Sequence, residues 1–194
     1  VTDLVALPLM RAIASVLLIV APLLGMRAIA GERQSGTLPL LQSSGTGGAG
    51  IVLGKFAALC GFFIVLIVLA LTMPASLAVG TQLDWGRLAT GALGLILFAA
   101  ALAAIAIAAS SFTRQTIVAA IAALAIGLVL WMLDAGARYE GVSSSFINYL
   151  ALPTHLEPFL RGIVATVDIV YFALIIAVAL TLAARRHDAE RERG

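Results

Sequence analysis

A polar stretch decides the fold of this chain: Ala30-Gly31-Glu32-Arg33-Gln34-Ser35-Gly36-Thr37-Leu38-Pro39-Leu40-Leu41, which continues to Ile51-Val52-Leu53-Gly54-Lys55. Hydrophobic runs long enough to cross a bilayer lie on both sides of it. Because charged side chains are costly inside lipid, the stretch is expected outside the membrane, on the cytoplasmic side. We interpret it as an element that receives force from a partner protein, which the flanking helices convert into movement across the membrane.

The composition is that of an integral membrane protein. The chain has 194 residues, of which 62% are apolar and 11% are charged, and its mean hydropathy is +1.10. A soluble domain carries about 25% charged residues. Residues 1–194 are therefore expected to form a single transmembrane domain without a nucleotide-binding or catalytic domain of its own. The formal net charge of +2 is scattered, which excludes a basic nucleic-acid surface.

Five segments are long and apolar enough to span a bilayer, which requires about 20 residues each. They are residues 4–30, 51–79, 88–109, 117–133 and 169–184. The sequence thus predicts an all-α polytopic helix bundle of about five spans. Cys60 is the only cysteine and lies in an apolar run, so disulfides and thiolate metal sites are excluded.

The basic residues in the connections predict the orientation, because cytoplasmic loops carry more Lys and Arg. One side of the membrane has eight: Arg27, Arg33, Lys55, Arg114, Arg185, Arg186, Arg191 and Arg193. The other side has four: Arg11, Arg87, Arg138 and Arg161. The Glu32 loop and the C-terminus are therefore expected in the cytoplasm. Five spans then put the N-terminus outside, and an absent earlier helix would place both ends inside.

Small residues recur four positions apart in the two middle spans. They are Ala100, Ala104 and Ala108 in one span, and Ala119, Ala123 and Gly127 in the next. This spacing lets helix backbones approach closely in lipid. It indicates a helix–helix or subunit interface, and a chance pattern in alanine-rich helices is the alternative.

The connection over residues 134–168 is expected to form short helices at the outer face. Thr154 and Glu157 have the spacing of a capping box, in which each side chain satisfies a backbone N–H at the helix start. His155, Glu157 and Arg161 lie within two helical turns. They could form a gate or contact a lipid headgroup, but local capping is the favoured interpretation. Asp168 is expected at a helix end, where its charge costs little.

No catalytic or metal-ligating pattern is present. The sequence lacks Gly-x-x-x-x-Gly-Lys-Ser/Thr, Gly-x-Ser-x-Gly and His-Glu-x-x-His. The chain is therefore either passive, like a channel or a fragment of a secondary transporter, or driven by another protein. A third hypothesis is an intramembrane enzyme that uses His155, Glu157 or Asp168.

The opening stretch resembles a family pattern. Glu32 to Leu41, followed by Ile51 to Phe56, is similar to E-R-x-x-G-T-L-E-L-L and then I-x-x-G-K. That pattern is found in type 2 permease subunits of ATP-binding-cassette (ABC) transporters, which have the type V exporter fold. Ser110-Ser111-Phe112-Thr113-Arg114 also resembles a loop of these permeases. Residues 149–162 and 168–172 are similar to the gliding-motility-type branch.

The resemblance implies six helices, so this chain would begin near the second, in the inner membrane of a bacterium. It implies a coupling helix within residues 31–50 that docks into a separate ABC ATPase. The ATPase would bind ATP and Mg²⁺, and this chain would bind no cofactor. Two permeases, as identical copies or paralogues, and two ATPases would form an exporter surrounded by membrane lipid. The substrate is not determined.

Individual residues acquire roles from the same resemblance. Gly36 would allow a tight turn and Thr37 would cap the following helix. Leu38, Leu40 and Leu41 would fill the groove of the ATPase. Glu32 and Arg33 would pair with charges on the ATPase or near the helix end. Lys55 would anchor the next span at the lipid headgroups. Pro39 departs from the family pattern, which has Glu at this position.

Overall fold

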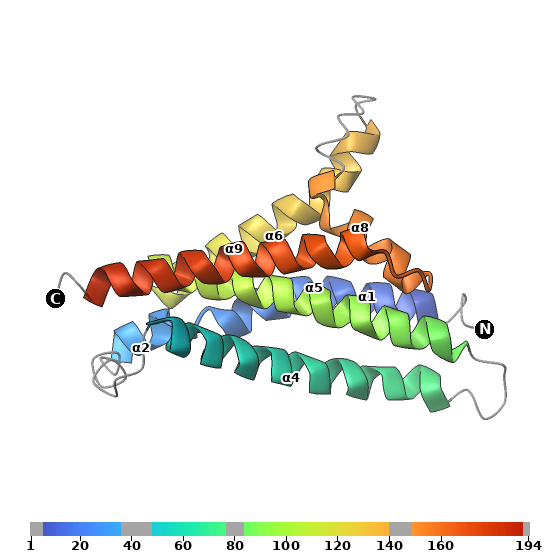
Figure 1. Ribbon diagram of the computed structural model, residues 1–194, viewed down its shortest axis with the longest axis horizontal. Coiled ribbons are helices and arrows are strands. Elements are labelled where there is room, and N and C mark those ends of the chain that lie inside the picture. The colour runs from blue at the N-terminus through green and yellow to red at the C-terminus, as the bar shows by residue number, and fades with distance from the viewer. Residues whose placement is uncertain (1–5, 36–47, 77–83, 140–148, 192–194) are drawn as a thin grey trace.

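The computed structural model describes residues 6–35, 48–76, 84–139 and 149–191 (Figure 1). Nearly all of them are helical, and no strand occurs within these ranges. The helices are α1 (Leu7–Gly25), α2 (Ala30–Ser35), α4 (Gly48–Ser76), α5 (Trp85–Phe112), α6 (Thr116–Tyr139), α8 (Leu152–Leu160) and α9 (Thr166–Arg191). Within the described ranges, five helical segments are long and apolar enough to cross a membrane. The predicted all-α polytopic bundle is confirmed.

Several helices begin or end at residues other than those predicted for the spans. α5 begins at Trp85, three residues earlier than predicted, because the Asp84 carboxylate accepts a hydrogen bond of 3.2 Å from the Arg87 backbone N–H. α9 continues through the charged tail to Arg191, because backbone hydrogen bonding needs no apolar side chains. The first predicted span is divided, since α1 ends at Gly25 and α2 begins at Ala30, after a connection of four residues.

α5 is the central helix of the bundle. It packs against α1, α4, α6, α8 and α9. Its alanines from Ala99 to Ala106 are buried, and the small side chains allow neighbouring helices to approach closely. Gly25 of α1 illustrates this, because a Cβ placed there would lie 2.3 Å from the Cβ of Ala106.

The predicted small-residue faces lie mainly between helices of this chain. Ala104, Ala119 and Ala123 are buried. A Cβ on Gly127 would lie 3.3 Å from Leu18 on α1 and 3.4 Å from Leu102 on α5. The face on α6 therefore packs inside the bundle, as the helix–helix interpretation predicted.

Figure 1 shows how the helices distribute between the two ends of the bundle. α2 and the C-terminal end of α9 lie at one end, which we call the α2 end. α8 and the first turns of α1 and α5 lie at the other, the α8 end. The Glu32 region and the C-terminal helix end therefore lie together, as the distribution of basic residues predicted.

The predicted capping box of Thr154 and Glu157 is wrong, because α8 begins before Thr154. The helix begins after Ala151, which makes no side-chain cap, and Pro153 lies in its first turn. Proline suits that position because its missing N–H would have no helical partner there. Thr154 is thus already inside the helix, and the Glu157 carboxylate binds two arginines instead of a backbone N–H.

Candidate functional site

The connection between α1 and α2 is fixed by a serine from the central helix. We call residues 26–30, which make this connection, the elbow. The Ser110 hydroxyl accepts hydrogen bonds from the backbone N–H groups of Ile29, at 3.1 Å, and Ala30, at 2.8 Å. It donates to the Met26 carbonyl oxygen at 3.0 Å. Ser110 is fully buried, so it caps α2 from another helix where water cannot.

The elbow also has a hydrophobic anchor. Ile29 is fully buried and forms a small core with Val52 of α4, Ile107 of α5 and Ala183 of α9. A side chain held by three spans cannot move unless at least one of them moves, because protein interiors are close-packed. The elbow therefore links displacement of α2 directly to the bundle.

An ion pair joins α2 to the start of the next span. The Lys55 ammonium of α4 donates to the Glu32 carboxylate of α2. Both side chains are about three-quarters buried, with 23% and 22% exposed, so the pair is partly shielded from water. Three spans and an ion pair thus surround the point where the chain leaves the bundle.

The structure brings together only part of the predicted coupling set. Glu32 and Lys55 are in contact, although the sequence suggested separate roles for them. Five of the remaining residues lie outside the described ranges: Gly36, Thr37, Leu38, Leu40 and Leu41. The backbone of Arg33 belongs to α2, but its side chain lies outside the described part of the chain. Their predicted roles stay predictions.

At the α8 end, the predicted polar cluster divides into two sites. His155 is buried, and its Nδ1 lies 2.6 Å from Oδ1 of Asp168, which is also buried. Its Nε2 lies 2.8 Å from the Tyr149 carbonyl oxygen, which can only accept. Nε2 therefore donates, and one proton lies between Nδ1 and the Asp168 carboxylate. Asp168 lies in the first turn of α9, as expected for a helix end, but the expectation that its charge costs little there is wrong, because burial makes that charge dependent on His155.

Tyr171 completes this first site. Its ring stacks on the His155 imidazole with centroids 3.9 Å apart and planes inclined by 20°. Its hydroxyl donates a 2.6 Å hydrogen bond to the Leu150 carbonyl oxygen. α9 is thereby bound to α8 through Asp168 and to the segment that leads into α8 through Tyr171.

The second site joins α8 to α1 and is partly exposed. The Glu157 carboxylate accepts from the Arg11 guanidinium and, at 3.1 Å, from Nε of Arg161. Burial opposes the charged carboxylate, but the hydrogen bonds and charges of the two arginines outweigh it and lower the pKa of Glu157. Arg11, Glu157 and Arg161 form one site, and His155 belongs to the other.

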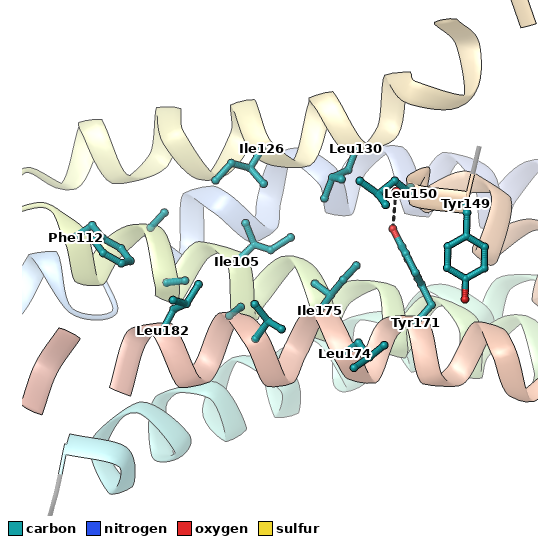
Figure 2. Close-up of a pocket in the computed structure, with 14 residues that line it drawn as sticks. Ile105, Phe112, Ile126, Leu130, Tyr149, Leu150, Tyr171, Leu174, Ile175 and Leu182 are labelled. Atoms are coloured by element: carbon teal, nitrogen blue, oxygen red, sulfur yellow. Dashed lines mark hydrogen bonds between the residues drawn. The ribbon is translucent and has the colours of Figure 1, made fainter. Parts of the chain in front are cut away.

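An apolar cavity of about 540 Å³ lies between α5, α6 and α9 (Figure 2). Ile105 and Phe112 line it from α5, Ile126 and Leu130 from α6, and Leu182 from α9. The hydrogen bond between Tyr171 and Leu150 closes its α8 end. The walls offer dispersion contacts and almost no hydrogen-bonding groups to an occupant.

Ser110 and the cavity were not predicted as functional features. The buried serine was visible as a polar residue at the end of an apolar run, next to a second serine, and in a stretch that resembles a permease loop. Neither observation indicated that it binds the elbow. Its partners lie 80 and 81 positions away, so no local pattern indicates them. The cavity depends on the divergence of α6 from α9, which is a property of the packing.

Two comparisons with known proteins bear on these sites. The family model described as ABC-2 family transporter protein matches residues 4–190, nearly the whole chain. No curated protein matches the chain. The matched range includes the elbow, the ion pair and both sites at the α8 end.

Proposed function

Because this chain belongs to the ABC-2 transporter family, and is thus a multi-pass, non-catalytic permease subunit, we propose that a second protein drives it. A separate ABC ATPase, which permeases of this family generally require, docks on residues 31–50 and supplies the energy. The assembly contains two permeases and exports its substrate across the inner membrane of a bacterium. The fold is the type V exporter fold, in its gliding-motility-type branch.

The elbow is the observation that carries this proposal. α2 leads directly into the segment that resembles the coupling helix. It is bonded to α5 through Ser110 and to α4 through Lys55. Force applied to α2 therefore reaches the central helix and a second span without passing through a flexible connection.

The chemistry is divided between two proteins in this proposal. ATP and Mg²⁺ bind to the ATPase, and closure of its nucleotide sites displaces the docked segment. This chain contributes no step of hydrolysis. Its residues bind the ATPase and transmit the displacement, and the α8 end, held by His155 and Asp168, forms the outer gate.

The distribution of the helix ends supports the assigned orientation. α2 and the C-terminal end of α9 lie at the same end of the bundle, which is the arrangement expected if both face the cytoplasm (Figure 1). The opposite end carries α8 and the Glu157 site, and we assign it to the outer face.

The decisive test is cross-linking in the assembled complex. A Leu40→Cys variant is co-expressed with a candidate ABC ATPase subunit, and disulfide or bifunctional cross-links are mapped. A cross-link to the ATPase is expected. The matched control is Thr154→Cys, at an exposed position of α8, which should give none. Cross-linking from Thr154→Cys alone, or labelling of the Leu40→Cys variant only from the outer side, contradicts the proposal.

A further inference from the structure

We infer that the α8 end carries a binding site for an anionic phospholipid, formed by Arg11, Arg161 and the cavities beside them. A polar cavity of about 660 Å³ is lined by these two arginines together with Glu157, Pro153, Thr154 and Ile163. The site lies apart from the coupling region and from the His155–Asp168 pair, and it goes beyond the proposed transport function.

The charge of the site favours an anion. Two guanidinium groups face one carboxylate, so one positive charge is in excess. Arg11 and Arg161 are 52% and 62% exposed, respectively. Each guanidinium has five N–H donors, and Glu157 uses only part of them. Donors therefore remain for a phosphate group, which guanidinium binds with matching geometry.

An apolar cavity adjoins the polar one. It measures about 250 Å³ and is lined by Ala14, Trp131, Leu156 and other side chains. Arg11, Pro153 and Glu157 border both cavities, so the polar and apolar parts are continuous. A ligand with a negative head and a hydrocarbon tail fits this combination, whereas a free inorganic anion would leave the apolar part unused.

The depth of the site matches the membrane interface. α5 has 28 residues, so at 1.5 Å per residue it is ~42 Å long and exceeds the ~30 Å hydrocarbon core by roughly 6 Å at each end. Met10, next to Arg11, packs against Gly91, the seventh residue of α5. This level lies ~9 Å along the helix, close to the hydrocarbon boundary. Arginine side chains at this depth reach the phosphate level.

The two tryptophans of the chain allow a direct test. Trp131 lines the apolar cavity, and Trp85 lies at the exposed start of α5. In the Trp85→Phe background the fluorescence of Trp131 is measured in phosphatidylcholine vesicles. A fraction of the lipid carries brominated acyl chains, either as phosphatidylglycerol or as phosphatidylcholine. Stronger quenching by the brominated phosphatidylglycerol is expected. We call the ratio of quenching by the two brominated lipids the preference, and each arginine should raise it roughly fivefold.

Variants distinguish the site from general surface charge. Arg11→Gln and Arg161→Gln should each reduce the preference about fivefold, and Glu157→Gln should increase it by removing the competing carboxylate. Arg87→Gln is the matched control, because Arg87 lies at the same end of the bundle and lines neither cavity. It should leave the preference unchanged. Circular dichroism checks that every variant is folded.

Three outcomes would overturn the inference. The first is equal quenching by the two brominated lipids. The second is a preference that Arg87→Gln reduces as much as Arg11→Gln does. The third is loss of the preference when sodium phosphate replaces sodium chloride at equal ionic strength, which would identify soluble phosphate as the ligand. None of these measurements involves an ATPase, so the result is independent of the proposed transport function.

Discussion

The Oγ atom of Ser110 on α5 lies 2.8 Å from the backbone nitrogen of Ala30, the first residue of α2. The same oxygen binds the N–H of Ile29, so one hydroxyl group satisfies two donors at the elbow. Helix starts leave such N–H groups without helical partners, and burial makes an unpaired one costly. The position of α2 is therefore tied to the central helix by a small number of identifiable bonds.

Replacing Ser110 with alanine should loosen the elbow. The Ser110→Ala variant leaves two buried N–H groups unpaired, at roughly 1–3 kcal/mol each. We expect a lower unfolding temperature in detergent and weaker stimulation of the ATPase by the permease, with ATPase binding retained. Ser111→Ala is the control, because Ser111 is equally buried but bonds only to Ala108 of its own helix. Equal effects of the two substitutions would contradict this role.

The Glu32–Lys55 pair should be coupled energetically. Glu32→Gln and Lys55→Gln should each reduce transport coupling, and the double variant should lose less than the sum of the two. A double-mutant cycle on thermal stability measures the interaction, for which we expect roughly 0.5–3 kcal/mol. The charge-reversed double variant, Glu32→Lys with Lys55→Glu, should recover part of the coupling. Strict additivity would show that the two residues act independently.

The sequence predicted the fold well because the spans are a property of composition. Runs of about 20 apolar residues are stable only across a bilayer or in a large core. Each of the five predicted segments contains a helix long enough to span, although the first also includes the connection to α2, and the other errors lie at helix ends. Asp84 extends α5 by capping it, and Gly25 ends α1 where that helix meets Ala106. Such ends depend on hydrogen bonds and close approaches that hydropathy does not contain.

The sites were less predictable for a physical reason. His155, Glu157 and Arg161 are neighbours on one short helix, so a shared cluster was the natural expectation. Their partners come from other helices: Asp168 from α9 and Arg11 from α1. The apolar side of α8, which includes Leu156 and Phe159, is visible in its sequence. The residues of other helices that meet this helix depend on contacts such as that of Phe159 with Gly94, which no local pattern specifies.

Glu157 should make stability sensitive to acid. Although partial burial opposes its charge, the two arginines lower its pKa below the ordinary value of 4.5. The ion pairs are then fully present above pH 4.5 and are lost as the pH falls through the lower folded-state pKa. Melting temperatures between pH 3 and pH 7, on the ordinary carboxylate scale, should fall less at the acid end for Glu157→Gln than for the natural chain. Identical acid slopes would exclude Glu157 as a contributor.

The buried pair at the α8 end should be costly to break. In Asp168→Asn an uncharged amide replaces the carboxylate that faces His155, and breaking a buried pair costs roughly 3–5 kcal/mol. Asp84→Asn is the matched control, because Asp84 also lies at a helix start but is exposed, and asparagine caps helices as well as aspartate does. Chemical unfolding in detergent should show a large loss for the first variant and almost none for the second. Similar losses would mean that burial of Asp168 does not matter.

The contact between α8 and α5 should tolerate no additional atom. A Cβ on Gly94 would lie 2.4 Å from the Cβ and 2.9 Å from the Cγ of Phe159, both close to the backbone of α8. Because Phe159 is fully buried, it cannot rotate away without opening the core. Gly94→Ala should therefore displace α8 and cost roughly 1–3 kcal/mol.

The control for this substitution is Gly61→Ala on α4, where an added Cβ meets nothing within 4 Å. Alanine favours a helix over glycine by up to about 1 kcal/mol, so this variant should be neutral or slightly stabilised. The measurement is the unfolding temperature, together with protease susceptibility of the segment between α8 and α9. If Gly94→Ala behaves like Gly61→Ala, then α8 is not held against the central helix by this close approach, and its position would depend on its contacts with α1 and α9, such as the Arg11–Glu157 and His155–Asp168 pairs.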